Sequence, residues 1–130
     1  MSRFVLDASA LLALLNDEPG ADKLPTESEL MSSAVISTVN LSEAHGKLVG
    51  SGVPAKEAWE AVLAPVSDVS DFSQEHAKRA GTLIAQTRSL GLSLGDRACL
   101  ALALSLGLPV YTADRQWAKL DVGVPIHVIR

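Results

Sequence analysis

Short, almost unbroken apolar runs alternate with amphipathic segments along the chain. The runs at residues 4–6, 34–37 and 110–112 are typical of strands buried on both faces, as parallel sheets require. Residues 66–72 alternate loosely between polar and apolar side chains and predict a weak strand, and residues 125–129 predict a final one. The pattern therefore predicts a mainly parallel sheet of short strands.

Apolar residues at helical spacing fill the intervals between these runs. The segment 94–106 is apolar almost all round, so we expect it to form a buried helix that ends at Gly107. Residues 21–33 contain Pro25 and predict a short polar helix or a loop. The other predicted helices cover 9–15, 40–49, 55–63 and 73–89, with a helical turn at 114–120. This alternation favours a layered α/β domain.

Three of the predicted helices have a definite inward face, which in the helix at 40–49 consists of Leu41, Ala44, Leu48 and Val49. In the helix at 55–63 we expect four residues to point inward: Ala58, Trp59, Val62 and Leu63. In the helix at 73–89, which Ser73 would cap, the expected inward residues are Ala77, Ala80, Leu83 and Ile84.

Length and charge narrow the classes of function. A chain of 130 residues with 48% hydrophobic residues predicts one globular domain over residues 1–130. Its 11 basic and 15 acidic residues argue against nucleic-acid binding through a broad basic face. This objection weakens if four of the acids surround metal ions, because the remaining charges then balance at 11 against 11.

The single cysteine, Cys99, has no partner for an intrachain disulfide, which fits a reducing compartment. The longest apolar run, 98–104, is too short to cross a bilayer, and Asp7 interrupts the only apolar stretch near the first residue. We therefore expect a cytoplasmic protein with no membrane contact.

Four acidic residues stand near the ends of predicted strands or at the start of helices. Asp7 and Asp114 follow the strands at 4–6 and 110–112, where the ligand crevice of a parallel sheet lies. Each is also a good helix cap, and this purely structural role is an equal alternative.

Glu43 and Asp96 lie in first turns of predicted helices, and each has a structural alternative. Glu43 fits a capping interaction with Asn40 or a surface pair with Lys47, four residues on. Asp96 matches a capping box with Ser93. Four carboxylates in one crevice would repel strongly unless cations bind, and oxygen ligands select hard ions such as Mg²⁺ or Mn²⁺.

These segments together resemble the PIN-domain ribonucleases, and more narrowly the VapC-type toxins of bacterial toxin–antitoxin pairs. The resemblance spans residues 3–129 and rests on the ordered motifs Val5-Leu6-Asp7-Ala8-Ser9, Ile36-Ser37 with Asn40-Leu41-Ser42-Glu43, Leu94-Gly95-Asp96-Arg97-Ala98 and Val110-Tyr111-Thr112-Ala113-Asp114. It implies a three-layer α/β/α sandwich, a Mg²⁺- or Mn²⁺-dependent endoribonuclease, a homodimer, and a cognate VapB-type antitoxin.

The resemblance also implies roles for individual residues. Metal ligation, direct or through water, would belong to Asp7, Glu43, Asp96 and Asp114, and Ser9 and Thr112 would orient those carboxylates. A metal-activated water would hydrolyse a phosphodiester of RNA, such as transfer or ribosomal RNA, leaving 5′-phosphate and 3′-hydroxyl ends. Candidate RNA contacts are Arg97, Lys47 and Arg115, for which a surface ion pair or solvated surface is the alternative.

Three other readings compete with the nuclease. A phosphoaspartate enzyme of the haloacid-dehalogenase type needs a second aspartate where this chain has Ser9. A receiver domain needs an acid pair after the first strand and a late lysine, and neither is present at Asp7 or at 110–114. A catalytically inactive PIN-fold RNA- or protein-binding module is the alternative that stays open.

Overall fold

A single parallel sheet forms the centre of the computed structural model, which describes residues 2–130. Its strand order is β3-β2-β1-β4-β5, and every neighbouring pair is parallel. The strands are β1 (Phe4–Leu6), β2 (Ala34–Ser37), β3 (Asp68–Ser70), β4 (Val110–Thr112) and β5 (Ile126–Val128). The prediction of a mainly parallel sheet is confirmed.

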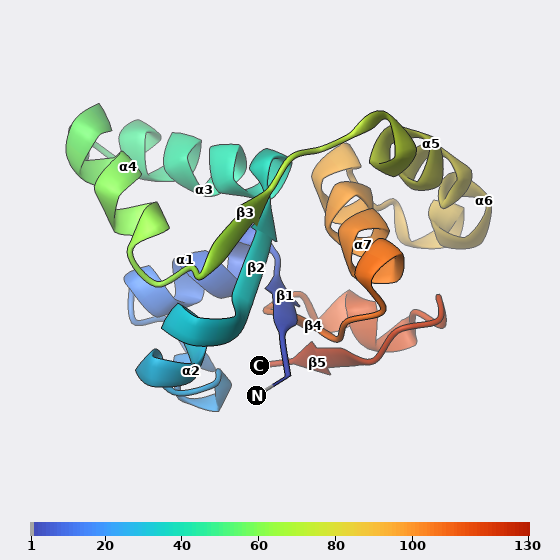
Figure 1. The fold of residues 1–130 in the computed structure, drawn as a ribbon, viewed down its shortest axis with the longest axis horizontal. Coiled ribbons are helices and arrows are strands. Elements are labelled where there is room, and N and C mark those ends of the chain that lie inside the picture. Colours follow the sequence, from blue (N-terminus) through green and yellow to red (C-terminus); the bar gives the residue numbers. More distant parts are fainter. Residues whose placement is uncertain (1) are drawn as a thin grey trace.

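Helices cover both faces of the sheet (Figure 1). The α-helices are α1 (Ala8–Leu15), α2 (Glu27–Ser33), α3 (Thr38–Gly50), α4 (Ala55–Leu63), α5 (Gln74–Thr82), α6 (Ile84–Thr87) and α7 (Leu94–Leu106). Short 3₁₀ turns are η1 (Ala21–Lys23), η2 (Arg88–Leu90) and η3 (Arg115–Lys119). Within residues 2–130, no helix has the length and apolar character that a bilayer span requires.

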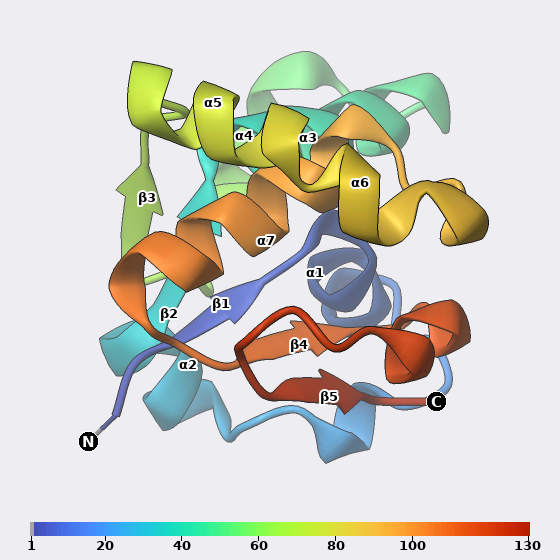
Figure 2. The ribbon, with the colours of Figure 1, turned by 90° about the vertical axis from the view of Figure 1, so that its right-hand side faces the viewer.

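The buried side chains divide between the two faces of the sheet. Val5, Val35 and Val110 pack against α7 and η3 on one face. Phe4 and Leu6 pack against α1, Leu24 and α2 on the other. A third cluster joins α1 to α3 and α4, which lie together above α1 in Figure 1. Figure 2, from the side, shows α7 lying across the sheet with α5 and α6 outside it. The predicted α/β/α sandwich is confirmed.

Local capping explains where two of the helices begin. Ser93 and Asp96 form a reciprocal capping box at the start of α7, and Gly107 ends this helix with a left-handed backbone conformation, φ 66°. Thr26 and Glu29 form a second capping box, which explains why the segment after Pro25 folds as the short helix α2.

The predicted helix at 73–89 differs from the structure in its inward face. The segment divides into α5, α6 and η2, and the break falls after Gly81 and Thr82, which have low helix propensity. The residues buried along it are His76, Ala80, Leu83 and Thr87, whereas Ala77 and Ile84 are exposed. Thr87 tolerates burial because its hydroxyl donates to the carbonyl of Leu83.

Three further expectations were wrong in detail. Val49, expected to face inward, is 38% exposed near the end of α3. Trp59 is 43% exposed and meets His45 edge to face, because α4 packs against its neighbours through Ala58 and Val62. Helix α3 begins before Asn40, because the Ser37 side chain at the end of β2 accepts from Val39 N and caps the helix there.

Candidate active site

The strand order places one crevice at the carboxyl ends of β1 and β4. Strand β1 has β2 on one side and β4 on the other, so the chain leaves β1 in opposite directions across the sheet. Parallel α/β sheets bind ligands at such a switch point. Asp7 follows β1 directly, Ala113 and Asp114 follow β4, and α3 begins where β2 ends.

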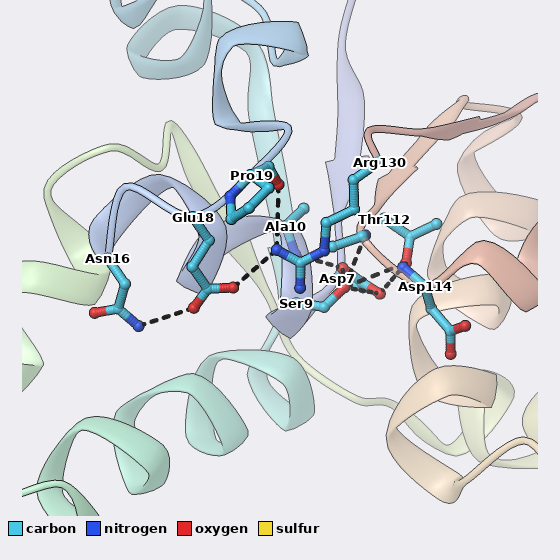
Figure 3. A network of polar contacts seen from close by, with 10 residues as sticks. Asp7, Ser9, Ala10, Asn16, Glu18, Pro19, Thr112, Asp114 and Arg130 are labelled. Atoms are coloured by element: carbon cyan, nitrogen blue, oxygen red, sulfur yellow. Dashed lines mark hydrogen bonds and ion pairs between the residues drawn. The ribbon is translucent and has the colours of Figure 1, made fainter.

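Asp7 is the most buried of the candidate acids, with 4% of its surface exposed. Its Oδ1 accepts from Ala10 N at 2.8 Å, which makes Asp7 the N-cap of α1. Ser9 Oγ lies 2.8 and 2.9 Å from the two carboxylate oxygens, and Thr112 Oγ1 donates to Oδ2 at 2.6 Å (Figure 3). Both residues predicted to orient a carboxylate therefore contact Asp7.

The carboxylate of Asp7 has no cationic partner among residues 2–130. Burial raises the pKa of Asp7 to about 6, against the hydrogen bonds from Thr112, Ala10 and Ser9, which lower it. The negative charge of Asp96 raises this pKa further. The site therefore disfavours the charged form of Asp7 until a positive ligand is present.

Glu43 lies against the first turn of α7. Asn40 Nδ2 donates to Glu43 Oε1 at 3.0 Å and to the carbonyl of Gly95 at 2.9 Å, so it ties α3 to α7. A Cβ at Gly95 would lie 2.6 Å from Glu43 Cδ, which is inside van der Waals contact. A side chain at this position would displace the Glu43 carboxylate from its present place.

Asp96 is partly buried at the start of α7, and its Oδ2 accepts from Ser93 N at 3.0 Å. Its charge acts on Asp7, as described above, and also on the buried thiol of Cys99. Burial holds the pKa of Cys99 well above its usual range, and the charges of Asp7, Asp96 and Glu43 add to this effect. Three carboxylates from three separate elements therefore lie close enough to act on one thiol.

Glu43 and Asp114 are the two exposed acids of the four, and Asp114 is turned away from Asp7. Its backbone N–H donates to Thr112 Oγ1 at 3.1 Å, but its side chain is exposed and caps η3 by accepting from Gln116 N at 2.9 Å. Figure 3 shows the Asp114 carboxylate pointing away from Asp7. The main chain of Asp114 therefore lies at the crevice, whereas its carboxylate points elsewhere and would have to rotate to approach Asp7.

The three candidate RNA contacts have different surroundings. Arg97 is partly buried, and its Nη1 donates to the carbonyl of Ala80 at 2.9 Å, so it joins α7 to α5. Arg115 is exposed at the start of η3. Lys47 lines a hollow beside Asp7 together with Ser9, Glu18 and Arg130.

Sequence reasoning did not identify Arg130 and Glu18 as neighbours of this crevice. Arg130 Nη1 donates to Glu18 Oε1 at 3.0 Å, and the two residues are 112 positions apart. No local motif signals such a contact. The role of Asn40 between Glu43 and Gly95 was also missed, although its spacing to Glu43 indicated a local interaction.

The side chains around Asp7 fit a hard divalent cation in their chemistry. They offer carboxylate oxygens, and the buried Oδ1 of Asn40 has no hydrogen-bond partner within the part of the chain that the structure describes. In that same part, no three acidic, histidine or cysteine side chains already form a metal cluster. Mg²⁺ does not need one, since it usually binds one or two carboxylates, several waters and substrate phosphates.

Comparison with known proteins gives a family match and a set of similar folds. The sequence profile of the PIN domain family matches residues 4–123. VapBC from Salmonella typhimurium bound to DNA has a TM-score of 0.74 at 21% identity, with 100% of both chains covered. VapBC2 from Rickettsia felis, bound to a promoter DNA fragment, has a TM-score of 0.74 at 16% identity, with 97% of each chain covered.

A third similar structure is that of a toxin. VapC20 from Mycobacterium tuberculosis, described as a sarcin–ricin loop cleaving toxin, has a TM-score of 0.70 at 19% identity. The alignment covers 94% of this chain and 98% of that one. No curated protein matches the sequence.

Proposed function

This chain belongs to the PIN domain family, and on that premise we propose that it is a Mg²⁺- or Mn²⁺-dependent endoribonuclease. The observation that carries the proposal is the buried Asp7 carboxylate, whose pKa the charge of Asp96 raises further, with no cation beside it among residues 2–130. Such carboxylates are costly to bring together unless a positive ligand binds between them.

In this proposal the chain positions the ion and the RNA phosphate. A divalent ion, when bound, activates water near neutral pH and neutralises charge on the phosphate. Asp7 and Asp96 hold the ion, and Ser9 and Thr112 keep the Asp7 carboxylate in one orientation. Asn40 holds Glu43 by one oxygen, Oε1, which leaves Oε2 for the ion or for a water beside it. Asp114 completes the set if its side chain turns away from η3.

We further propose that the protein is the toxin of a toxin–antitoxin pair. The similar folds include VapBC complexes, which supports a VapB-type antitoxin as partner. VapC20 is described as cleaving the sarcin–ricin loop, so ribosomal RNA is one candidate substrate and transfer RNA another. A homodimer and a cytoplasmic location complete the proposal.

The test is RNA cleavage by the purified chain with Mg²⁺ or Mn²⁺ and with EDTA. We expect cleavage only with a divalent ion, products with 5′-phosphate and 3′-hydroxyl ends, and loss of cleavage in Asp7→Asn and Asp96→Asn. Circular dichroism of both variants controls for folding. Cleavage by both variants at the wild-type rate, or 2′,3′-cyclic phosphate ends, contradicts the proposal.

The alternative is an inactive PIN-fold module that binds RNA or protein. It predicts no cleavage by wild type under any divalent ion, so the same assay separates it from the nuclease. The Asp7 carboxylate favours the nuclease, because it is buried without a cation and is raised in pKa by Asp96, and an RNA-binding role alone gives no reason to bury such a group.

A further inference from the structure

A polar hollow of about 240 Å³ opens directly beside Asp7. Ser9 belongs to both places, since its hydroxyl bonds to the Asp7 carboxylate and its side chain lines the hollow. The other lining residues come from the end of α1 and the loop after it, from the last turn of α3, and from Arg130. The hollow is smaller than the roughly 300–1,000 Å³ of sites for drug-sized ligands, so it suits a phosphate group with part of a sugar.

Arg130 is held at the wall of this hollow by a fixed set of contacts. Its Nη1 donates to Glu18 Oε1 at 3.0 Å and to the carbonyl of Pro19 at 3.2 Å (Figure 3). Gly20, with φ 94°, allows this loop to approach the backbone of Ile129, where a Cβ would lie 2.8 Å from the carbonyl carbon. Within residues 2–130, Nη2 and Nε of Arg130 have no partner, so these donors are available to a ligand.

Lys47 supplies a second positive charge. Its ammonium group has no hydrogen bond or ion pair with any residue from 2 to 130, although its charge contributes to lowering the pKa of Glu18. The hydrogen bond from Arg130 is the largest cause of that lowered pKa, so Glu18 is ionised at neutral pH. Lys47 and Arg130 against Glu18 give the hollow a net charge of about +1.

An RNA strand that reaches Asp7 needs a basic side chain with free donors next to the acids. The three carboxylates repel the phosphates on either side of the one being cut. Arg97, the cation nearest to Asp96 in sequence, already donates to the Ala80 carbonyl and lies between α7 and α5. Lys47 has no ion pair among residues 2–130 and Arg130 keeps Nη2 and Nε available, so both can hold the strand on the Ser9 side.

We propose that this hollow is a subsite for the phosphodiester next to the one that is cleaved, bound by Lys47 and Arg130. The subsite rests on the proposed ribonuclease function, because it would bind the part of the RNA strand that continues beyond the phosphodiester cleaved at Asp7. Glu18 and Asn16 act as positioning residues, since Asn16 Nδ2 donates to Glu18 Oε2 at 3.2 Å and Glu18 in turn orients Arg130.

The test measures RNA binding without cleavage. A labelled single-stranded RNA of about 12 nucleotides is titrated with the full chain in EDTA at several salt concentrations. We expect Lys47→Gln and Arg130→Gln each to reduce the slope of log K against log salt by about 0.7, the value for one lost phosphate contact on a single strand. Lys78→Gln, the same change on exposed α5, should leave the slope as in wild type.

Two further arms separate a phosphate subsite from a structural ion pair. Glu18→Gln raises the net charge of the hollow, and the glutamine Oε1 can still accept from Arg130 Nη1 and keep it in place. RNA should therefore bind about two- to fivefold more tightly, whereas a purely structural Glu18–Arg130 pair predicts no gain. A DNA strand of the same sequence should lose the same slope in Lys47→Gln, since the contact is to phosphate. Unchanged slopes in Lys47→Gln and Arg130→Gln, or an effect confined to RNA, overturn the subsite.

Cleavage of the same RNA with Mn²⁺ is measured in parallel. Absence of cleavage by wild type refutes the proposed function, while the binding series in EDTA still decides the subsite. If wild type cleaves and Lys47→Gln binds with the wild-type slope, the proposed function stands and the subsite is wrong. Lys47→Gln carries this decision because Lys47 has no structural partner among residues 2–130 whose loss would unfold the chain.

Discussion

Thr112 Oγ1 donates a hydrogen bond of 2.6 Å to Asp7 Oδ2, and this bond joins the carboxyl ends of β4 and β1 across 105 positions of sequence. The same hydroxyl oxygen accepts from Asp114 N at 3.1 Å and lies 3.3 Å from Ser9 Oγ. One buried threonine therefore fixes the orientation of the central carboxylate and the path of the chain after β4.

Replacing Thr112 with valine keeps its shape and removes the donor. We expect the pKa of Asp7 to rise above about 6, because the Thr112 bond is the largest of the contacts that lower it. The unfolding free energy should fall by about 1.5–3 kcal/mol, as for a lost hydrogen bond to a charged group. Carbon-detected NMR titration of the carboxyl groups and urea unfolding measure the two quantities.

The matched control for this variant is Thr87→Val. Thr87 is buried to the same degree but donates to the neutral carbonyl of Leu83 on the outer helices. Its loss should cost about 0.5–1.5 kcal/mol and leave the pKa of Asp7 unchanged. Equal pKa values for Asp7 in wild type and Thr112→Val would refute the role assigned to Thr112.

Asp7→Asn should stabilise the chain when no metal is present. The pKa of Asp7 is raised by folding from 3.8 to about 6, so the unfolded chain releases the proton more readily. Below pH 3.8 Asp7 is protonated in both the folded and the unfolded chain, so no charge is buried. The free energy of unfolding then falls as the pH rises from 3.8 through about 6. That loss is on the order of 3 kcal/mol at pH 7.

Urea unfolding in EDTA should therefore find Asp7→Asn more stable than wild type at pH 7, by about 1–3 kcal/mol. The difference should shrink to a few tenths near pH 4. Asp71→Asn, a change at an exposed position, provides the control. A stability difference that does not vary between pH 4 and pH 7 would mean that the charge of Asp7 costs the fold nothing.

Gly95→Ala should reduce cleavage without unfolding the chain. The new Cβ would lie 2.6 Å from Glu43 Cδ, so the carboxylate has to leave its bond to Asn40. Gly81→Ala on α5 meets nothing within 4 Å and should stabilise the protein by about 0.5–1 kcal/mol with full activity. Activity assays and thermal melts compare the two. If Gly95→Ala cleaves RNA at the wild-type rate, the placement of Glu43 is not needed for the reaction.

Asp114 requires a variant that keeps its cap. Asn also caps helices, so Asp114→Asn removes the charge while retaining the contact to Gln116 N. Because the carboxylate points away from Asp7, we expect Asp114→Asn to reduce kcat/KM by less than Asp96→Asn does. An equal loss in both variants would show that Asp114 turns into the crevice during the reaction.

The parts of the fold that sequence predicts well are those set by local chemistry. Residues 4–6, 34–37 and 110–112 form β1, β2 and β4, because apolar runs of this length suit only buried strands. The capping box of Ser93 and Asp96 marks the start of α7. Asp7, at the end of β1, lies at the switch point as expected.

The parts that sequence missed depend on tertiary contacts. Helix α5 buries His76, because packing against α7 selects a face one position away from the most apolar one, and α6 buries Thr87. The pair of Glu18 and Arg130 forms only once β5 brings the last residue beside the loop after α1. The direction of the Asp114 carboxylate is set by the cap of η3, which no spacing of acids reveals.

Crystals of the wild-type chain soaked in Mn²⁺, with diffraction recorded for anomalous scattering, test the central claim most directly. The account predicts one strong peak within about 2.0–2.3 Å of carboxylate oxygens of Asp7 and Asp96, absent from Asp7→Asn crystals treated in the same way. A Mn²⁺-occupied crystal with no peak beside Asp7, or a peak that survives Asp7→Asn unchanged, would contradict it.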